Sequence, residues 1–83
     1  MATFERSDTY NKVIDIIAEK ISVDKAIITP QSTFATLGAD SLDMVEVIMK
    51  LEEVFSIEIK DEDVEKMATI NDLVEYVQKL RTK

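Results

Sequence analysis

Glycine and proline, the residues that most often form tight turns, each occur only once in this 83-residue chain, as Gly38 and Pro30. A β-rich fold needs many tight turns, and most of these require such residues. The chain also has no glycine-rich loop of the kind that wraps phosphate groups. These absences predict helices that are joined by a small number of connections.

Apolar residues at helical spacing predict a first helix over about residues 8–20, capped by Ser7 or Asp8. Residues 21–40 keep no sustained period and predict a long loop. A loop of this length inside a compact domain is usually functional or held by its own apolar side chains. Phe34 and Leu37 are the expected anchors of the loop.

Three further helices are expected after this loop. The first of them starts at residue 40 or 41 and ends near residue 55. A brief helix capped by Asp61 follows over residues 61–66, and Thr69 and Asp72 form a capping box at the start of the last helix. The sequence therefore predicts one all-α domain over residues 1–83. Its fold is a small four-helix bundle of three long helices and one short helix, with the long loop between the first and second helices.

Two apolar stripes follow the helix expected after the loop. One stripe has the spacing of a core face and comprises Met44, Val47, Ile48, Leu51 and Phe55. The other lies roughly 130° around the helix axis and comprises Leu42, Val45 and Met49, bordered by Asp43, Glu46, Glu52 and Glu53. The second stripe either packs on another helix of the bundle or forms an exposed strip that docks on partner proteins. The pattern leaves both interpretations open.

Negative charge is concentrated in the same region. Residues 40–65 contain ten acidic and two basic residues, a net charge of −8, whereas the rest of the chain has a net charge of +1. Such a block repels nucleic acid and anionic membranes and attracts basic protein surfaces. It can equally be a solvated face that keeps the protein soluble. We expect no nucleic-acid partner, and the lack of a long apolar run predicts no membrane insertion.

The chain lacks the side chains that most enzymes use as nucleophiles and bases. It contains no histidine and no cysteine, which excludes a Ser-His-Asp triad, a protein thiol nucleophile and a zinc–thiolate site. The acidic run at residues 61–63 lacks the turn glycine of a calcium loop. We therefore expect no catalytic residue and no dedicated metal site. The absence of cysteine also fits a reducing compartment.

Ser41 lies between two aspartates in the segment Gly-Ala-Asp-Ser-Leu-Asp at residues 38–43. If Asp40 is the helix cap, the Ser41 hydroxyl lies in the first turn, at the positive end of the helix dipole. This position favours an anionic phosphate ester. It is also where many serines simply begin a helix. The residues alone make attachment at Ser41 possible without deciding it.

The segment at residues 37–43, Leu-Gly-Ala-Asp-Ser-Leu-Asp, resembles the acyl carrier proteins of type II (dissociated) fatty acid synthesis. The match continues through Val45-Glu46, Met49, Leu51-Glu52-Glu53 and Phe55, and the order of expected helices extends it over almost the whole chain. The resemblance implies a carrier protein without intrinsic catalysis. It also implies a monomer in the bacterial cytoplasm or, as the alternative, in the plastid stroma.

In this family the matching serine carries the cofactor, so the resemblance implies 4′-phosphopantetheine on Ser41, next to Asp40 and Leu42. A phosphopantetheinyl transferase adds the group from coenzyme A, and its thiol then carries growing fatty acyl chains as thioesters. The implied partners are this transferase, malonyl transferase, ketosynthase, ketoreductase, dehydratase, enoyl reductase and acyltransferases.

The resemblance also implies two sets of contact residues. The surface that docks on basic patches of these enzymes would comprise Asp40, Leu42, Asp43, Val45, Glu46, Met49, Glu52 and Glu53. The cavity that receives the acyl chain would be lined by Ile48, Leu51, Ile59, Val64 and Met67.

Three features depart from the usual bacterial pattern. The segment from Phe34 to Leu37 is one residue shorter and lacks an aspartate, as in plastid members. Lys50 replaces a small residue, and Val54 replaces a frequent third glutamate. A carrier for polyketide or other acyl transfer, and an unmodified acidic adaptor in which Ser41 only starts a helix, are the alternative functions.

Overall fold

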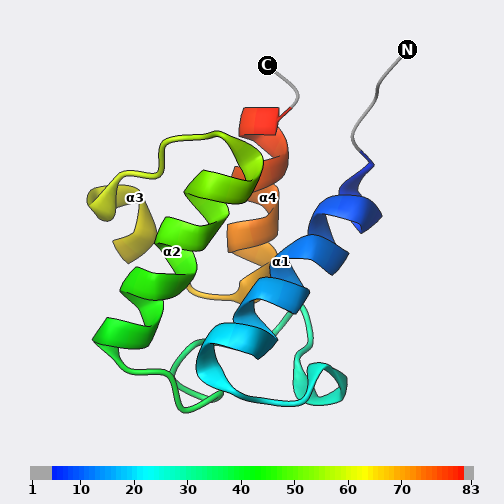
Figure 1. The fold of residues 1–83 in the computed structure, drawn as a ribbon, viewed down its shortest axis with the longest axis vertical. Helices are drawn as coiled ribbons and strands as arrows, with labels where there is room; N and C mark the ends of the chain where they lie inside the picture. Colours follow the sequence, from blue (N-terminus) through cyan, green and yellow to red (C-terminus); the bar gives the residue numbers. More distant parts are fainter. Residues whose placement is uncertain (1–4, 82–83) are drawn as a thin grey trace.

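The computed structural model describes residues 5–81 and contains four α-helices (Figure 1). They are α1 (Arg6–Ile21), α2 (Ser41–Phe55), α3 (Asp61–Glu65) and α4 (Ile70–Arg81), with a 3-10 helix, η1 (Lys25–Ile27), in the long loop after α1. No β-strand occurs among the described residues. The predicted all-α bundle, with three long helices, one short helix and a long first loop, is confirmed.

Helix α1 is the central element of the bundle, because it contacts both α2 and α4. It runs in the opposite direction to these two helices, and the long loop crosses the end of the bundle where α1 stops (Figure 1). Helix α3 lies on the outside, next to α2 and α4. Within the described residues, each helix is too short or too polar to span a lipid bilayer.

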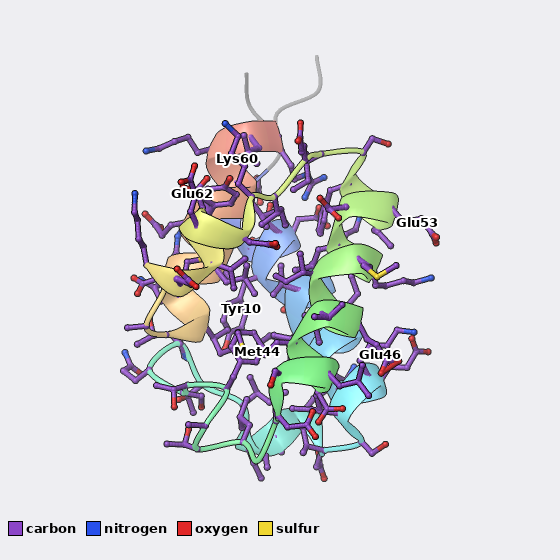
Figure 2. All side chains as sticks on the ribbon, turned by 90° about the vertical axis from the view of Figure 1, so that its left-hand side faces the viewer. Tyr10, Met44, Glu46, Glu53, Lys60 and Glu62 are labelled. Carbon is purple, nitrogen blue, oxygen red and sulfur yellow. The ribbon has the colours of Figure 1, made fainter. Side chains whose placement is uncertain are left out.

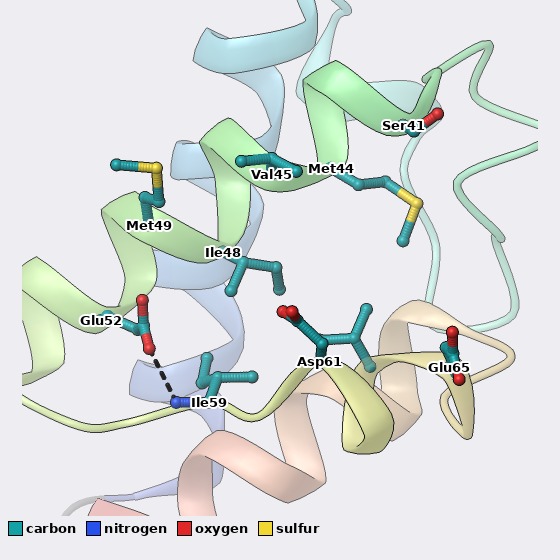
Figure 3. Close-up of a pocket in the computed structure, with 10 residues that line it drawn as sticks. Ser41, Met44, Val45, Ile48, Met49, Glu52, Ile59, Asp61 and Glu65 are labelled. Atoms are coloured by element: carbon teal, nitrogen blue, oxygen red, sulfur yellow. Dashed lines mark hydrogen bonds between the residues drawn. The ribbon is translucent and has the colours of Figure 1, made fainter.

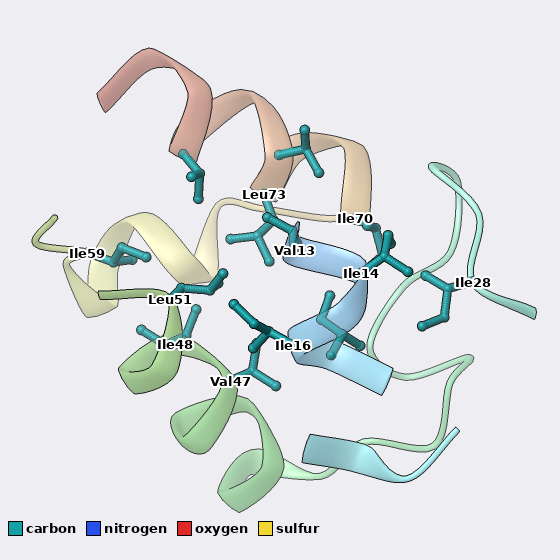
Figure 4. Close-up of a cluster of buried hydrophobic side chains, with 13 residues drawn as sticks. Val13, Ile14, Ile16, Ile28, Val47, Ile48, Leu51, Ile59, Ile70 and Leu73 are labelled. Atoms are coloured by element: carbon teal, nitrogen blue, oxygen red, sulfur yellow. The ribbon is translucent and has the colours of Figure 1, made fainter. Parts of the chain in front are cut away.

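The core consists of 13 buried apolar side chains from every part of the bundle except α3 (Figure 4). Helix α1 contributes Val13, Ile14, Ile16 and Ile17, α2 contributes Val47, Ile48 and Leu51, and α4 contributes Ile70, Leu73, Val74 and Val77. Two further members, Ile28 and Ile59, come from the connections. Burial of a side chain of this size contributes about 1.5–3 kcal/mol, so these two residues hold their connections on the bundle.

Helix α1 starts earlier than predicted and has a different cap. It begins at Arg6, so Ser7 and Asp8 lie inside the helix, and the prediction that either caps it is wrong. The Asp8 carboxylate instead accepts a hydrogen bond from Nη1 of Arg81 at 3.2 Å. A side chain that could have capped α1 therefore ties α1 to the end of α4.

The capping box predicted at the start of α4 is confirmed. The backbone N–H of Thr69 donates to Oδ2 of Asp72, and the N–H of Asp72 donates to Oγ1 of Thr69, both at 3.2 Å. The N–H of Ala68 donates to the same carboxylate at 2.9 Å. Because these backbone hydrogen bonds stabilise the charged form, they lower the pKa of Asp72 below its ordinary value of 3.8.

Helix α3 is capped differently from the prediction. Lys60 occupies the N-cap position without a side-chain hydrogen bond, and Asp61 is the first helical residue. The helix ends at Glu65, one residue short of the expected end. Its first turn contains only acidic residues, which interact favourably with the positive end of the helix dipole. This interaction explains why a helix can start here without a side-chain cap.

The long loop is attached to the bundle as predicted, with additional contacts that the sequence did not indicate. Phe34 and Leu37 are half-buried against the core, which confirms them as anchors. The first two N–H groups of α4 also donate to loop carbonyls: Ile70 N to Ser32 O at 2.8 Å and Asn71 N to Pro30 O at 2.9 Å. The loop therefore caps α4 while it carries the chain from α1 to α2.

We predict that Leu51→Ala lowers the free energy of unfolding by about 2–5 kcal/mol, because it leaves a cavity at a fully buried position of the core. Leu42→Ala is the matched control, since Leu42 is 67% exposed on the same helix. We expect the control to change stability by no more than about 0.5 kcal/mol. Urea unfolding followed by circular dichroism measures both variants, and equal losses would contradict the placement of Leu51 in the core.

Candidate functional site

Ser41 is the first residue of α2, and its neighbours form a complete capping box around it. Oδ1 of Asp40 accepts a hydrogen bond from the backbone N–H of Asp43 at 2.9 Å, and the N–H of Asp40 donates to Oδ2 of Asp43 at 3.2 Å. Of the two expected starts, residue 40 or 41, the helix begins at Ser41, with Asp40 as its cap. Because Asp40 provides the cap, the Ser41 side chain stays exposed at the start of the helix, with its hydroxyl directed away from it (Figure 3).

The single glycine of the chain forms the turn that leads into Ser41. Gly38 has a φ of 81°, in the left-handed region that residues with a side chain rarely adopt. Its N–H donates to Ala35 O at 3.1 Å, and the N–H of Ala39 donates to Phe34 O at 2.9 Å. These bonds turn the chain from the anchored loop directly into α2. Ser41 is therefore positioned by this turn before it and by the capped helix after it.

The second apolar stripe of α2 is exposed. Leu42 is 67%, Val45 52% and Met49 62% exposed, so the interpretation that the stripe packs on another helix of the bundle is wrong. Glu46 and Glu53 point away from the bundle on the outer side of α2 (Figure 2). The structure therefore presents an apolar strip with carboxylates along its border.

Lys50 changes the charge at one end of this strip. Its Nζ lies 3.2 Å from Oε1 of Glu53, and the two side chains are 36% and 74% exposed. Such exposed pairs contribute about 0–1 kcal/mol to stability, but the lysine offsets the charge of Glu53. Within the described residues Glu46 has no such pair. Val54, where the family often has a glutamate, adds exposed apolar surface instead of charge.

Glu52, which was predicted to belong to the docking surface, lies differently from the other acids of α2. It is half-buried, and its Oε2 accepts a hydrogen bond from the backbone N–H of Ile59 at 2.9 Å (Figure 3). Its carboxylate is therefore engaged with the connection between α2 and α3. No contact with a partner enzyme is present to test the docking role of Glu52, so that role stays a prediction.

A groove of about 420 Å³ lies between α2 and α3, and Ser41 stands at its edge (Figure 3). Ten residues line it: Ser41, Met44, Val45, Ile48, Met49, Glu52, Ile59, Asp61, Val64 and Glu65. Among the side chains predicted to line an acyl cavity, Ile48, Ile59 and Val64 form part of this wall.

The other two predicted cavity residues lie elsewhere. Leu51 is fully buried in the core, because it belongs to the face of α2 that packs on the bundle. Met67 lines a separate hollow of about 270 Å³, together with Asp72 and Tyr76 of α4. The sequence had indicated Met44 as a core residue one helical turn after Ser41, but not that it points into the groove.

Helix α3 is tied to α4 by a side-chain hydrogen bond. The Tyr76 hydroxyl donates to Oδ2 of Asp63 at 2.7 Å. This bond, with burial and the nearby negative charge, raises the pKa of Tyr76 above its ordinary value of 10.0. Helix α3, which forms the wall of the groove opposite α2, is therefore held by α4 on the side that faces away from the groove.

The described residues bring no three or more acidic side chains into a cluster that could hold a metal ion. The acidic run of α3 points along a short exposed helix and does not converge. The features available next to the start of α2 are therefore the exposed Ser41 hydroxyl, a largely apolar groove and an acidic border.

Comparison with known proteins assigns a class to this arrangement. Residues 11–77 match the family described as a phosphopantetheine attachment site. The chain belongs to this family and, within it, to the acyl carrier proteins, whose attached cofactor is 4′-phosphopantetheine.

Individual relatives agree in sequence and in fold. The chain is 52% identical to an acyl carrier protein of Syntrophobacter fumaroxidans over 69 residues, which cover 82% of this chain and 85% of the relative. The solution structure of a candidate acyl carrier protein from Anaplasma phagocytophilum superposes with a TM-score of 0.82 at 30% identity, over 95% of this chain and 94% of that one. The crystal structure of an acyl carrier protein from Thermotoga maritima gives 0.79 at 31% identity, over 96% and 94% of the two chains.

Proposed function

We propose that Ser41 carries the 4′-phosphopantetheine group and that the protein presents growing fatty acyl chains, held as thioesters, to the enzymes of fatty acid synthesis. The observation that carries this proposal is the exposed Ser41 hydroxyl at the start of α2, beside the groove and the acid-bordered apolar strip. A carrier needs an attachment point, a shelter for its cargo and a recognition surface. All three elements are available within α2 and α3.

The backbone around Ser41 is suited to a phosphodiester. The N–H of Asp43 is taken by the Asp40 side chain, and Met44 is the first residue whose N–H bonds back to the Asp40 carbonyl, at 3.1 Å. The N–H groups of Ser41 and Leu42, among those that a helix start leaves free, are therefore available to phosphate oxygens. The helix dipole adds a further favourable interaction with the negative ester.

Attachment follows from the chemistry of coenzyme A. The Ser41 hydroxyl attacks the phosphorus atom that bears pantetheine, so a bond forms between Oγ and phosphorus while the pyrophosphate bond breaks. Adenosine 3′,5′-bisphosphate leaves, and a base of the phosphopantetheinyl transferase takes the hydroxyl proton. The bound group supplies the thiol that this cysteine-free chain lacks.

The groove between α2 and α3 is the proposed site for the acyl chain. Its side walls carry Met44, Ile48 and Val64, whose apolar side chains can replace water around a hydrocarbon chain. Methionine also adapts its shape to chains of different length. Asp61 and Glu65 lie at the polar margin of the groove, where a solvated edge is expected.

The exposed strip of α2 is the proposed docking surface, with Leu42, Val45 and Met49 as its apolar part and Asp40, Asp43, Glu46 and Glu53 as its charged part. Negative charge of this kind steers encounter with basic surfaces and raises association rates. We assign it to the phosphopantetheinyl transferase, malonyl transferase, ketosynthase, ketoreductase, dehydratase, enoyl reductase and acyltransferases.

We further propose that residues 1–83 act as one carrier domain, as a monomer and without catalysis of their own. The bacterial relative supports a bacterial cytoplasmic location. The short segment between Phe34 and Leu37 keeps the plastid stroma as the alternative.

We predict that incubation with coenzyme A and a phosphopantetheinyl transferase adds the mass of one phosphopantetheine to the protein, and that Ser41→Ala abolishes the addition. Intact-mass spectrometry measures both. Ser32→Ala is the matched control, because Ser32 is a loop serine whose hydroxyl bonds within the loop, and it should be modified like the wild type. An unmodified wild type, or equal modification of Ser41→Ala, would refute the assignment.

We also predict that Glu46→Lys weakens binding of the holo-protein to a ketosynthase of fatty acid synthesis by about tenfold at low salt, because it reverses a charge at the docking surface. The loss should shrink at high salt as screening increases. Glu19→Lys makes the same change in net charge on the exposed side of α1 and serves as the control. Titration calorimetry measures both, and equal effects of the two variants would show that net charge alone determines binding.

A further inference from the structure

Among the acidic residues of α2, only Glu52 lines the groove. Its Oε2 accepts the hydrogen bond from Ile59 N at 2.9 Å, across seven residues of chain. This bond links the last turn of α2 to the connection that leads into α3. Glu46 and Glu53, by contrast, point outward from α2, away from the bundle (Figure 2).

The Ile59 N–H depends on this acceptor. The Ile59 side chain is 5% exposed and belongs to the core, so the residue cannot turn outward to find water without leaving the core. A buried N–H without a partner is unfavourable. The Glu52 carboxylate therefore satisfies the backbone at the point where the connection enters the core.

Helix α3 is too short to hold its own position. It has five residues, and isolated helices of this length are not stable in water. No residue of α3 is buried, and Val64 is only half-buried against the core. The described polar ties around it include the Glu52–Ile59 bond just before its start and the Tyr76–Asp63 bond on its far side. The backbone of Lys60 also bonds to the Tyr76 hydroxyl, and the N–H of Ala68, after the end of α3, donates to Asp72.

We propose that Glu52 is a positioning residue of the groove: its carboxylate holds Ile59, and with it the start of α3, so that the wall opposite α2 keeps its distance from Ile48. Glu52 thus stabilises the protein's own structure, and the carboxylates of α2 that point outward, such as Glu46 and Glu53, provide the negative charge for docking. We call the hydrogen bond between Ile59 N–H and the Glu52 carboxylate the tether. The effect of the tether on an acyl chain rests on the proposed function, whereas the tether itself is a property of the unmodified protein.

Two substitutions separate the positioning role from a charge role. Glu52→Gln removes the negative charge but keeps a side-chain oxygen that can accept from Ile59 N–H. Glu52→Ala removes both the charge and the acceptor. Glu58→Ala is the matched control, because Glu58 is an exposed carboxylate of the same connection, and its removal changes the net charge by the same amount.

The first measurement is amide hydrogen exchange of Ile59 in the unmodified protein, followed by NMR. We expect exchange to be at least about tenfold faster in Glu52→Ala, because a hydrogen bond to a charged acceptor is lost. Glu52→Gln should stay within about threefold of the wild type, and Glu58→Ala should match the wild type. If Glu52→Ala fails to fold, Glu52→Leu, which keeps the bulk without an acceptor, takes its place. Unchanged exchange of Ile59 without the acceptor would overturn the proposal.

The second measurement uses the octanoyl-loaded protein. Cleavage of the thioester by hydroxylamine should be several-fold faster in Glu52→Ala than in the wild type or Glu52→Gln, since a displaced wall shelters the chain less. Equal rates in all three would overturn the link between the tether and the groove. If Ser41 takes no phosphopantetheine, the proposed function is refuted. The exchange measurement on the unmodified protein still tests whether Glu52 holds the Ile59 N–H.

A ketosynthase titration decides between positioning and docking. If Glu52 acts as a docking charge, Glu52→Gln should weaken binding as much as Glu52→Ala does. The positioning role predicts instead that Glu52→Gln retains the affinity of the wild type within about threefold. Equal weakening by both variants would overturn the proposal.

Discussion

Burial of one face of α2 against α1 determines the direction of every functional side chain on that helix. Val47 and Leu51 are fully enclosed in the core, and the helical period then leaves no freedom for the remaining positions. Leu42, Val45 and Met49 must be exposed, and Val45 and Met49 also border the groove that Met44 and Ile48 line. A single packed interface thus sets which side chains of α2 lie in the core, which line the groove and which form the exposed strip.

The opposite wall of the groove is built in a different way. Helix α3 contributes no fully buried residue, and hydrogen bonds from its neighbours locate it. Elements with few buried contacts open at low free-energy cost. The groove therefore has one wall, α2, that is anchored by buried side chains, and one wall, α3, that is held mainly by hydrogen bonds.

Local patterns in the sequence predicted the fold well where neighbouring residues decide the structure. The predicted capping box of Thr69 and Asp72 acts over three residues, and the helical stripe of Val47 and Leu51 is visible in the spacing. The cap of α1 was wrong because Asp8 is engaged by Arg81, a residue 73 positions away. Exposure of the second stripe of α2 could not be predicted, because it depends on where α3 and α4 come to lie.

In the candidate site, too, features set by neighbouring residues were predicted, whereas features set by contacts between distant segments were not. The resemblance to acyl carrier proteins pointed to Ser41, and the start of α2 is where the structure leaves a hydroxyl exposed. Of the five residues expected to line an acyl cavity, Ile48, Ile59 and Val64 lie around this groove, whereas Leu51 lies in the core and Met67 lines another hollow. Which side chains line a hollow beside α3 depends on where α3 packs, and spacing along the chain does not show this. Glu52 looked like its acidic neighbours in the sequence and differs only through a contact with Ile59.

We propose that an acyl chain attached at Ser41 lies in the groove between α2 and α3. Nuclear Overhauser contacts in the holo-protein loaded with a carbon-13-labelled octanoyl group test this placement. We expect contacts from the octanoyl methylenes to the methyl groups of Ile48, Ile59 and Val64. Contacts to Met67 and Tyr76 instead, or an octanoyl chain without any contact to the protein, would contradict it.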